Sequence, residues 1–336
     1  MTEPADRRAP VAQVRRAVRA AFARLPDPAR DAPAVVACSG GPDSLALAAA
    51  VVAARGSDGV CAVVVDHGLQ DGSAGQARAT VAVLAGLGMP AQVHSVALSG
   101  SGGVEATARR ARYVALRAAR PHPESPVLLG HTLDDQAETV LLGLGRGSGA
   151  RSIAGMRAWN APWLRPLLGV RRATTRAACA ALGLPVWDDP HNVDPRFTRA
   201  RLRHEVLPLL EDVLAGGVAE ALARTAAQLR DDVEALDAIA GRLLVEATRE
   251  PADSGAAAEL DLDALIGVPP ALRRRVLRAW LSALGVTALT DAHLRAADVL
   301  AGRGPDRAGV AVPGGLELIR ARGRLGLRPV RWPPDR

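Results

Sequence analysis

One segment constrains the fold of this 336-residue chain more than any other. An apolar run at 34–38 leads into the sequence SGGPDS at 39–44, and a stretch rich in alanine and leucine follows. This order predicts a buried strand, a tight turn and a helix. Further apolar runs lie at 60–65, 91–96 and 126–129, and most of them precede a loop and an alanine-rich segment. The alternation predicts an α/β fold with a Rossmann-like parallel sheet, which binds ligands at the carboxyl ends of its strands.

The residues of the turn have the properties of a phosphate-binding loop. Gly40 and Gly41 let the backbone bend sharply and let a ligand approach its amides, and Pro42 suits the first turn of a helix. The helix N-terminus offers N–H groups to an anion, and Ser39 and Ser44 add hydroxyl donors. A capped strand-to-helix turn would explain SGG alone. The full SGGPDS motif between a strand and a helix favours a phosphate site.

The composition limits how this loop can act, because the chain contains no lysine and all 42 of its basic residues are arginine. A Walker A loop, a protein-kinase site and a Schiff-base lysine are therefore excluded. Any ATP chemistry must be done without a lysine on the phosphates, and backbone amides and Mg²⁺ can carry the phosphate charge instead. Asp43 is unfavourable beside phosphates unless it meets Mg²⁺ or a reacting group, which makes it a catalytic candidate.

Two other segments place polar residues where ligands are expected. Asp66 and His67 follow the second strand, where nucleotide-binding folds often contact a ribose or a base, although a simple turn explains them when they are taken alone. Glu105, Arg109 and Arg112 share one face of a predicted helix. That face is either a solvated ion pair or a site for an amino acid or a phosphate group.

The segment GHTLDDQAET at 130–139 ends a predicted strand and begins a helix. Thr132 and Asp135 have the spacing of a capping box, and acids in a first turn are favoured by the helix dipole. Asp134, Asp135 and Glu138 nevertheless put three carboxylates on one turn, which is more than a cap requires. Such a group can bind a cationic amine and accept its proton, or hold a metal ion. We favour binding of an amine or Mg²⁺ over a dedicated zinc site.

The second half of the chain has a different character. The pattern predicts a further short strand at 186–189, long helices over 202–248 and a basic tail with a short strand at 316–320. We therefore expect an α/β domain at 1–205 and a second, mainly helical domain at 206–336.

Charge and composition narrow the classes of function. A net charge of +7 allows a polyanionic partner without requiring one, and an aromatic content of 2% disfavours a base-stacking platform. Cys38, Cys61 and Cys179 form no CxxC pair, which disfavours a zinc ribbon or redox site and suits a reducing compartment. No segment has the length of a membrane span or the pattern of a signal peptide. We expect a cytoplasmic protein without membrane contact.

Together these segments resemble one family, the bacterial tRNA(Ile)-lysidine synthetases, which are PP-loop ATP pyrophosphatases. The resemblance departs from the family pattern at Ala200, where an asparagine usually stands between two arginines. The matching segments are SGGPDS (39–44), VDHGL (65–69), EATARRARY (105–113), GHTLDDQAETVLLGLGRGSG (130–149), GM (155–156), RPLL (165–168), WDDPHN (187–192) and RFTRARLRHEVLP (196–208).

The resemblance implies a reaction. ATP, with Mg²⁺, would adenylate O2 of the wobble cytidine of a tRNA(Ile) and release pyrophosphate. The ε-amine of free L-lysine would then attack C2, and AMP would leave. The implied partners are therefore tRNA(Ile) and lysine; a homodimer is one option that the sequence leaves open. The resemblance also implies that residues 1–205 form the catalytic domain and that the helical domain at 206–336 binds the tRNA.

The resemblance also implies roles for single residues, and these agree with the residue types found in each loop. Asp43, Asp135 and Glu138 would be catalytic. The implied binding residues are Ser39, Gly40, Gly41, Pro42, Asp43, Ser44, Asp66 and His67 for ATP; Arg112, Asp134, Asp135 and Glu138 for lysine; and Arg196, Arg199, Arg201, Arg203 and His204 for tRNA.

Three other interpretations fit the sequence less well. A tRNA thiolation enzyme of the same superfamily should carry cysteines in CxxC form, which this chain lacks. An amide- or amidine-forming synthetase, such as an NAD or GMP synthetase, would not explain the basic second half together with the DDQAET segment. A non-catalytic RNA-binding protein would not need an intact loop and an acidic cluster, and ATP turnover to AMP would exclude it.

Overall fold

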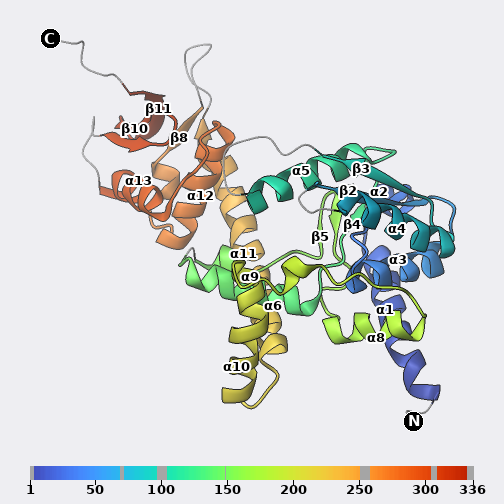
Figure 1. Cartoon of the computed structure of the whole chain (residues 1–336). Helices are drawn as coiled ribbons and strands as arrows, with labels where there is room; N and C mark the ends of the chain where they lie inside the picture. Colours follow the sequence, from blue (N-terminus) through green and yellow to red (C-terminus); the bar gives the residue numbers. More distant parts are fainter. Residues whose placement is uncertain are drawn as a thin grey trace. The chain divides into compact units, whose positions relative to one another are not determined.

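The computed structural model describes residues 4–68, 72–96, 104–147, 149–249, 258–303 and 309–330. The chain divides into two compact units, residues 1–227 and 228–336 (Figure 1). No helix in these described ranges has both the length and the apolar character needed to cross a membrane.

The first unit contains the expected parallel sheet with its helices, so the predicted α/β fold is confirmed (Figure 1). The strand order is β3-β2-β1-β4-β6-β5, and only β5 runs antiparallel to its neighbour. The strands are β1 (Ala34–Ala37), β2 (Val60–Asp66), β3 (Ala91–Ser95), β4 (Val127–Leu128), β5 (Trp159–Asn160) and β6 (Trp163–Leu164). The helices are α1 (Pro4–Ala23), α2 (Asp27–Asp31), α3 (Pro42–Arg55), α4 (Ser73–Gly86), α5 (Val104–Ala118), α6 (Leu133–Gly145), α7 (Ala150–Ile153), α8 (Arg172–Ala181), α9 (Thr198–Arg201) and α10 (Leu207–Val213).

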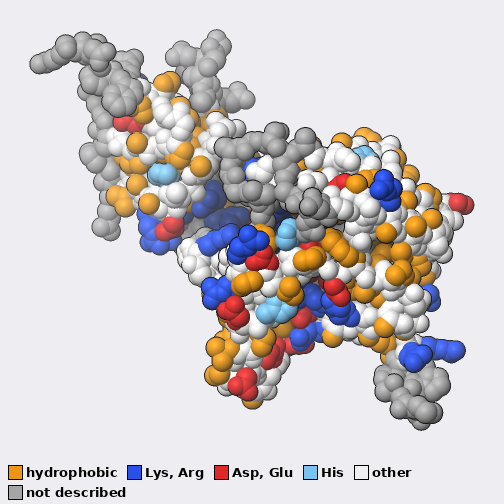
Figure 2. Space-filling view, in the orientation of Figure 1, with side chains coloured by type: hydrophobic (Ala, Val, Ile, Leu, Met, Phe, Trp, Pro, Cys, Tyr) orange, Lys and Arg blue, Asp and Glu red, His pale blue; other side chains and the backbone are white. Residues whose placement is uncertain are grey.

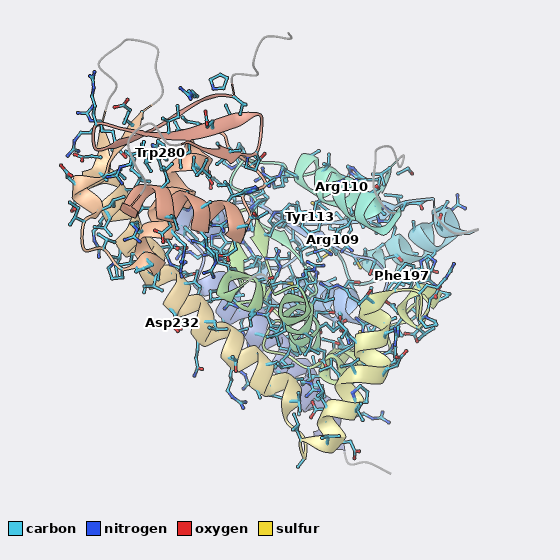
Figure 3. All side chains as sticks on the ribbon, turned by 90° about the vertical axis from the view of Figure 1, so that its left-hand side faces the viewer. Arg109, Arg110, Tyr113, Phe197, Asp232 and Trp280 are labelled. Carbon is cyan, nitrogen blue, oxygen red and sulfur yellow. The ribbon has the colours of Figure 1, made fainter. Side chains whose placement is uncertain are left out.

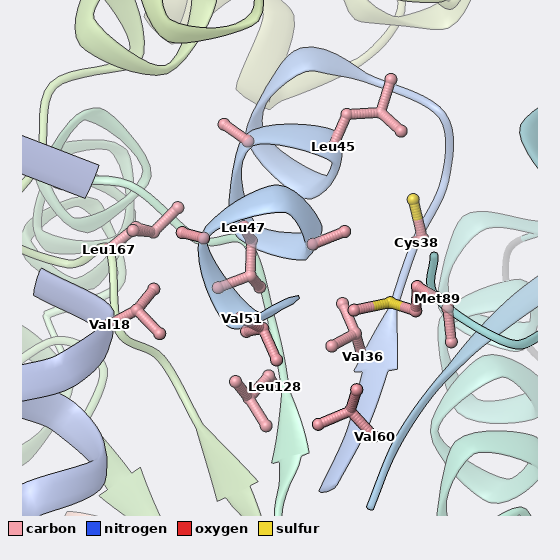
Figure 4. Close-up of a cluster of buried hydrophobic side chains, with 14 of the residues drawn as sticks. Val18, Val36, Cys38, Leu45, Leu47, Val51, Val60, Met89, Leu128 and Leu167 are labelled. Carbon is pink, nitrogen blue, oxygen red and sulfur yellow. The ribbon is translucent and has the colours of Figure 1, made fainter. Parts of the chain in front are cut away.

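The sheet is buried on both faces, which explains why its strands are apolar throughout. Alternate residues of β1 point to opposite sides: Val36 lies in one hydrophobic cluster and Val35 in the other. The first cluster also contains side chains of α1, α3, α4 and α8 (Figure 4), and the second is covered by Leu116 of α5. This layering brings the loops after β1, β2 and β4 to one edge of the sheet.

The structure corrects one expected strand. Residues 186–189 form no strand; they are an extended segment that crosses the phosphate loop, where the Trp187 N–H donates to the Gly40 carbonyl at 3.0 Å. The long first helix, α1, was not predicted, and it packs through Val14, Val18 and Phe22 into the core.

The second unit contains an antiparallel sheet as well as helices. Its strand order is β7-β8-β11-β10-β9, and its core includes Leu260, Leu277 and Leu318. The strand expected at 316–320 is present, whereas four others were not anticipated. The elements are the end of α11 (Val218–Ala247), β7 (Thr248–Arg249), β8 (Glu259–Asp261), α12 (Pro270–Ala283), α13 (Asp291–Arg303), β9 (Gly309–Val312), β10 (Leu316–Ala321) and β11 (Arg324–Pro329).

The division into compact units falls after residue 227, and not after residue 205 as the sequence suggested. The reason is packing: Ala219, in the first turn of α11, lies in a small hydrophobic cluster with Leu133, Ala137 and Leu207. A division of labour between residues 1–205 and 206–336 stays a prediction.

Candidate active site

The phosphate loop between β1 and α3 is organised around the hydroxyl of Ser44. This hydroxyl donates to the Gly41 carbonyl at 2.9 Å and accepts from the Ser39 N–H at 3.2 Å. Gly40 has a φ of +83°, and a Cβ there would lie 2.5 Å from Oγ1 of Thr80. Only glycine fits this position, because both the backbone conformation and the space exclude a side chain. The loop therefore has the open, tightly bent shape that a phosphate cradle needs.

The start of α3 can receive an anion. No side chain caps this helix, and Pro42 occupies its first turn. A cavity of about 190 Å³ adjoins the loop and is lined by apolar β2 residues, Thr80 and Leu116. Asp66 and His67 lie at its rim, where sequence analysis placed them for ATP. Such a pocket beside a helix N-terminus suits a nucleoside whose phosphates reach the loop.

The acidic cluster begins α6, at the edge of a larger cavity of about 760 Å³ that also touches the phosphate loop. Asp135 forms the predicted capping box: one carboxylate oxygen accepts from the Thr132 N–H at 2.8 Å and from its hydroxyl at 2.9 Å. Asp134 accepts from the Arg172 N–H at 2.7 Å and so caps α8. Asp134 and Asp135 both line the cavity, together with Asp43.

Arg172 links the phosphate loop to the acidic cluster, and sequence analysis missed it. Its guanidinium lies 3.5 Å from Asp43, 2.6 Å from Asp135 and 3.4 Å from Glu138. An arginine in the first turn of a helix opposes the helix dipole and so calls for acidic partners. That unfavourable position was the one signal in the sequence that could have identified it.

Glu138 differs from the other acids because its side chain is 0% exposed and does not line the cavity. Arg203 donates to it at 2.9 Å, and Arg199 and Arg172 each approach it at 3.4 Å. Direct contact between Glu138 and a lysine substrate would require these arginines to move. In this structure, Glu138 instead positions guanidinium groups around Asp135.

The neighbourhood changes the pKa values of the carboxyl groups in opposite directions. Burial raises the pKa of Asp43, and the hydrogen bond from Thr175 and the charge of Arg172 offset this only partly. Burial also acts to raise the pKa of Asp135, but Arg172 and the Thr132 N–H outweigh it and lower that pKa. Asp135 is therefore held as a carboxylate beside the cavity.

The residues expected to face tRNA separate into two groups. Arg199 and Arg203 point inward to Glu138, as described above. Arg196 pairs with Asp194, and Arg201 pairs with Glu205, both at the exposed surface. The remaining member, His204, lies with Nε2 3.1 Å from the Asn192 carbonyl oxygen. The two exposed ion pairs are local, and an RNA phosphate could replace the carboxylate partner of either arginine.

Arg112 lies where three cavities meet, beside both the nucleoside pocket and the acidic cluster. Burial lowers the pKa of its guanidinium. Next to it on α5, Arg109 stacks on Tyr113, with Cζ 5.1 Å from the ring centroid (Figure 3). The third cavity extends from Arg112 to Phe197, one of only two phenylalanines in the chain. The position of Arg112 suits an anionic group of a substrate.

No group of three or more His, Cys, Asp or Glu side chains in the described residues is arranged to hold a metal ion. Mg²⁺ commonly binds through one or two carboxylates and the phosphates of a substrate. Asp43, at the phosphate loop and on the cavity wall, is the residue that fits this mode.

His131 gives the site a testable pH dependence. Burial lowers its pKa to about 3, against the opposing charge of Asp135. Below pH ~6.5 the unfolded chain gains a proton on this residue that the folded chain does not, so acid weakens folding. We expect the free energy of unfolding to fall by about 1 kcal/mol per pH unit between pH 6.5 and 5, relative to a His131→Gln variant. Urea titrations of both proteins measure this, and parallel pH curves would contradict it.

Comparisons with known proteins identify two family models and several relatives that match this chain. A family model described as a PP-loop domain matches residues 13–210, and one described as the TilS substrate binding domain matches residues 260–326. A tRNA(Ile)-lysidine synthase from Rhodococcus erythropolis is 57% identical, over 87% of this chain and 88% of the relative. A tRNA(Ile)-lysidine synthase from Mycolicibacterium paratuberculosis is 59% identical, over 83% of this chain and 85% of the relative. Among solved structures, the U34-tRNA thiolase NcsA from Methanococcus maripaludis aligns with a TM-score of 0.55 and 16% identity, covering 66% of this chain and 79% of that one, which is a likeness of fold.

Proposed function

The chain belongs to the tRNA(Ile)-lysidine synthase family, and from that membership we propose how its own residues carry out the reaction. It is a ligase that forms lysidine on a tRNA, and it uses ATP. One observation supports the residue roles most directly: the phosphate loop and Asp134 and Asp135 line the same cavity. An ATP phosphate and an amine can therefore meet there. Because tRNA substrates are cytoplasmic in bacteria, we place the enzyme in the cytoplasm.

In the first step the enzyme holds ATP between the nucleoside pocket and the start of α3. The cytidine O2 attacks the α-phosphorus, the bond to the bridging oxygen breaks, and pyrophosphate leaves. Ser39 and Ser44 hold the phosphates with the loop amides, as sequence analysis proposed. Asp43, with the phosphates, would hold Mg²⁺, which supplies positive charge for the leaving pyrophosphate.

In the second step the ε-amine of free lysine attacks C2 of the adenylated cytidine, and AMP leaves with the oxygen. Asp134 and Asp135 attract the ammonium group and accept its proton before attack. Glu138 acts through the arginines that it holds, and Arg112 binds the lysine carboxylate. Arg196, Arg201 and His204 contact phosphates of the tRNA, whereas Arg199 and Arg203, which point inward to Glu138, help to position the acidic cluster.

Incubation with ATP, labelled lysine and bulk tRNA tests the proposal. Digestion of the RNA and nucleoside analysis should reveal labelled lysidine, formed only when ATP is present and accompanied by AMP and pyrophosphate. Release of ADP and phosphate, or label that is absent from the RNA, would contradict the assignment. A sulfur-transfer activity would show as a thiolated nucleoside in the same digest.

The phosphate loop itself is tested by two substitutions. Asp43→Ala and Ser44→Ala should each abolish pyrophosphate release, because the first removes the loop's carboxylate and the second removes the hydroxyl that joins Ser39 to Gly41. Ser125→Ala is the matched control, since Ser125 is equally buried but lies outside the loop. Pyrophosphate release is measured directly, and normal release by Ser44→Ala would contradict the role of the loop.

A further inference from the structure

The first helix presents a strongly basic surface that the reaction does not use. Residues 7–24 include six arginines and no acidic residue. The apolar side of α1 is fixed in the protein core, because Val14, Val18 and Phe22 are buried. The arginines on its other sides are exposed. Basic side chains at the chain's N-terminal end are visible at the surface in Figure 2.

Four of these arginines line a groove of about 690 Å³ between α1 and the end of α8, here called the arginine groove. Its lining residues are Arg7, Arg8, Val11, Ala12, Arg15, Arg19, Ala181 and Leu182. None of the four arginines has an ion pair or a hydrogen bond with any residue that the structure describes. A cation beside a helix C-terminus can stabilise the helix dipole, but a single cation is enough for this. None of the four arginines donates a hydrogen bond to a described carbonyl of α8. Within the described part of the chain, the groove therefore has more guanidinium groups than anionic partners for them.

We propose that the arginine groove binds the phosphate backbone of the substrate tRNA, outside the catalytic cavity. The proposal rests on the function proposed above, which supplies a polyanionic substrate. Guanidinium groups match phosphate oxygens in geometry and charge, and several in one groove can follow successive phosphates. An anionic membrane is a poorer partner, because the apolar side of α1 is already buried and cannot insert into lipid.

Helix α8 connects the groove to the site of reaction. Its first residue, Arg172, contacts the acidic cluster, and its last, Ala181, lines the groove. Its 10 residues span about 15 Å, since a helix rises ~1.5 Å per residue. That distance corresponds to roughly four nucleotides along one strand of a duplex. A tRNA whose wobble nucleotide enters the cavity can therefore reach the groove with a neighbouring part of the same strand.

Binding of full-length tRNA to the whole protein, measured between about 50 and 200 mM salt, tests the proposal. The test variant is Arg8→Gln/Arg15→Gln. The matched control is Arg78→Gln/Arg146→Gln, which removes two exposed arginines elsewhere in the same compact unit. Because each lost phosphate contact lowers the salt slope by about one, the test variant should show a slope about two units shallower and, at 200 mM salt, roughly tenfold weaker binding. ATP binding and the control variant should be unchanged.

A test variant with the wild-type salt slope would overturn the proposal. An equal loss in the control would also overturn it, because the effect would then be one of net charge alone. Binding of the wild type to phosphatidylserine vesicles, lost in the test variant while tRNA binding is kept, would assign the groove to a membrane instead. Failure of the wild type to form lysidine would contradict the proposed function and leave the comparison of salt slopes intact.

Discussion

Asp135→Asn is expected to slow lysine transfer by roughly 10²–10⁴-fold while ATP still binds. The lysine amine has an ordinary pKa of about 10.4, so it is protonated at neutral pH and must lose a proton before it attacks. Asp135 is held as a carboxylate at the cavity wall, and asparagine removes its charge and basicity. The side chain of asparagine can still accept from the Thr132 N–H, which preserves the helix cap. Steady-state kinetics with labelled lysine measure the rate and the apparent lysine affinity.

Two further measurements make this result specific. The rate should recover partly at high pH, where more of the lysine amine is neutral. Asp27→Asn is the control, because Asp27 is an exposed acid in a surface ion pair with Arg30. Transfer by Asp135→Asn at the wild-type rate and lysine affinity would mean that Asp135 serves only as a cap for α6 and a partner for Arg172.

Arg172→Met is expected to lower the free energy of unfolding by about 3–5 kcal/mol. The guanidinium compensates Asp43, Asp135 and Glu138, and the last of these has no exposed surface. Without the guanidinium charge, the carboxylates stay buried and uncompensated. This lowers the free energy of unfolding more than the loss of a surface ion pair does. The control is Arg176→Met, one turn further along α8. Arg176 forms an ion pair with Asp188 in which both side chains are more than half exposed, so losing it should lower the free energy of unfolding by only about 0–1 kcal/mol. Urea unfolding of the three proteins provides the comparison.

The loss should shrink as the pH is lowered. In the wild type the pKa of Asp135 is lowered, so its contribution to stability is present at neutral pH and disappears as the pH falls through that value. Without Arg172, burial would raise the pKa of the Asp135 carboxyl. Protonation of that carboxyl at lower pH would then remove the buried charge and reduce the loss of stability in the variant. The two unfolding free energies should therefore converge from pH 7 toward pH 4. A difference that does not change with pH would show that Arg172 stabilises the fold by packing alone.

The sequence by itself determined the features that lie within short contiguous segments. The alternation of strands and helices, the phosphate loop at 39–44 and the capping box of Thr132 and Asp135 each depend on neighbours a few residues apart. Their chemistry was also readable, because the loop at 39–44 contains no basic residue and can therefore hold a phosphate only through its amides and hydroxyls. Family membership followed from the same segments, since their order along the chain is what identifies a family.

Only the tertiary structure decided which distant residues meet. Arg172 lies 34 residues or more from its three acidic partners along the chain, and the order of strands in the sheet brings them together. Arg199 and Arg203 point inward to Glu138, whereas Arg201, between them, points to solvent. Residue type cannot distinguish these arginines, because their direction depends on how the helix packs.

The second unit shows the same limit for secondary structure. Its strands are short. β7 pairs only with β8, and β8 depends on pairing with β11, which lies far along the chain. Local propensity therefore favoured helix there. At 186–189 it favoured a strand, but the backbone of that segment instead bonds to the phosphate loop. The sequence specified the chemical groups of the site and their local turns, whereas packing decided which charges are compensated and which stay free for a substrate.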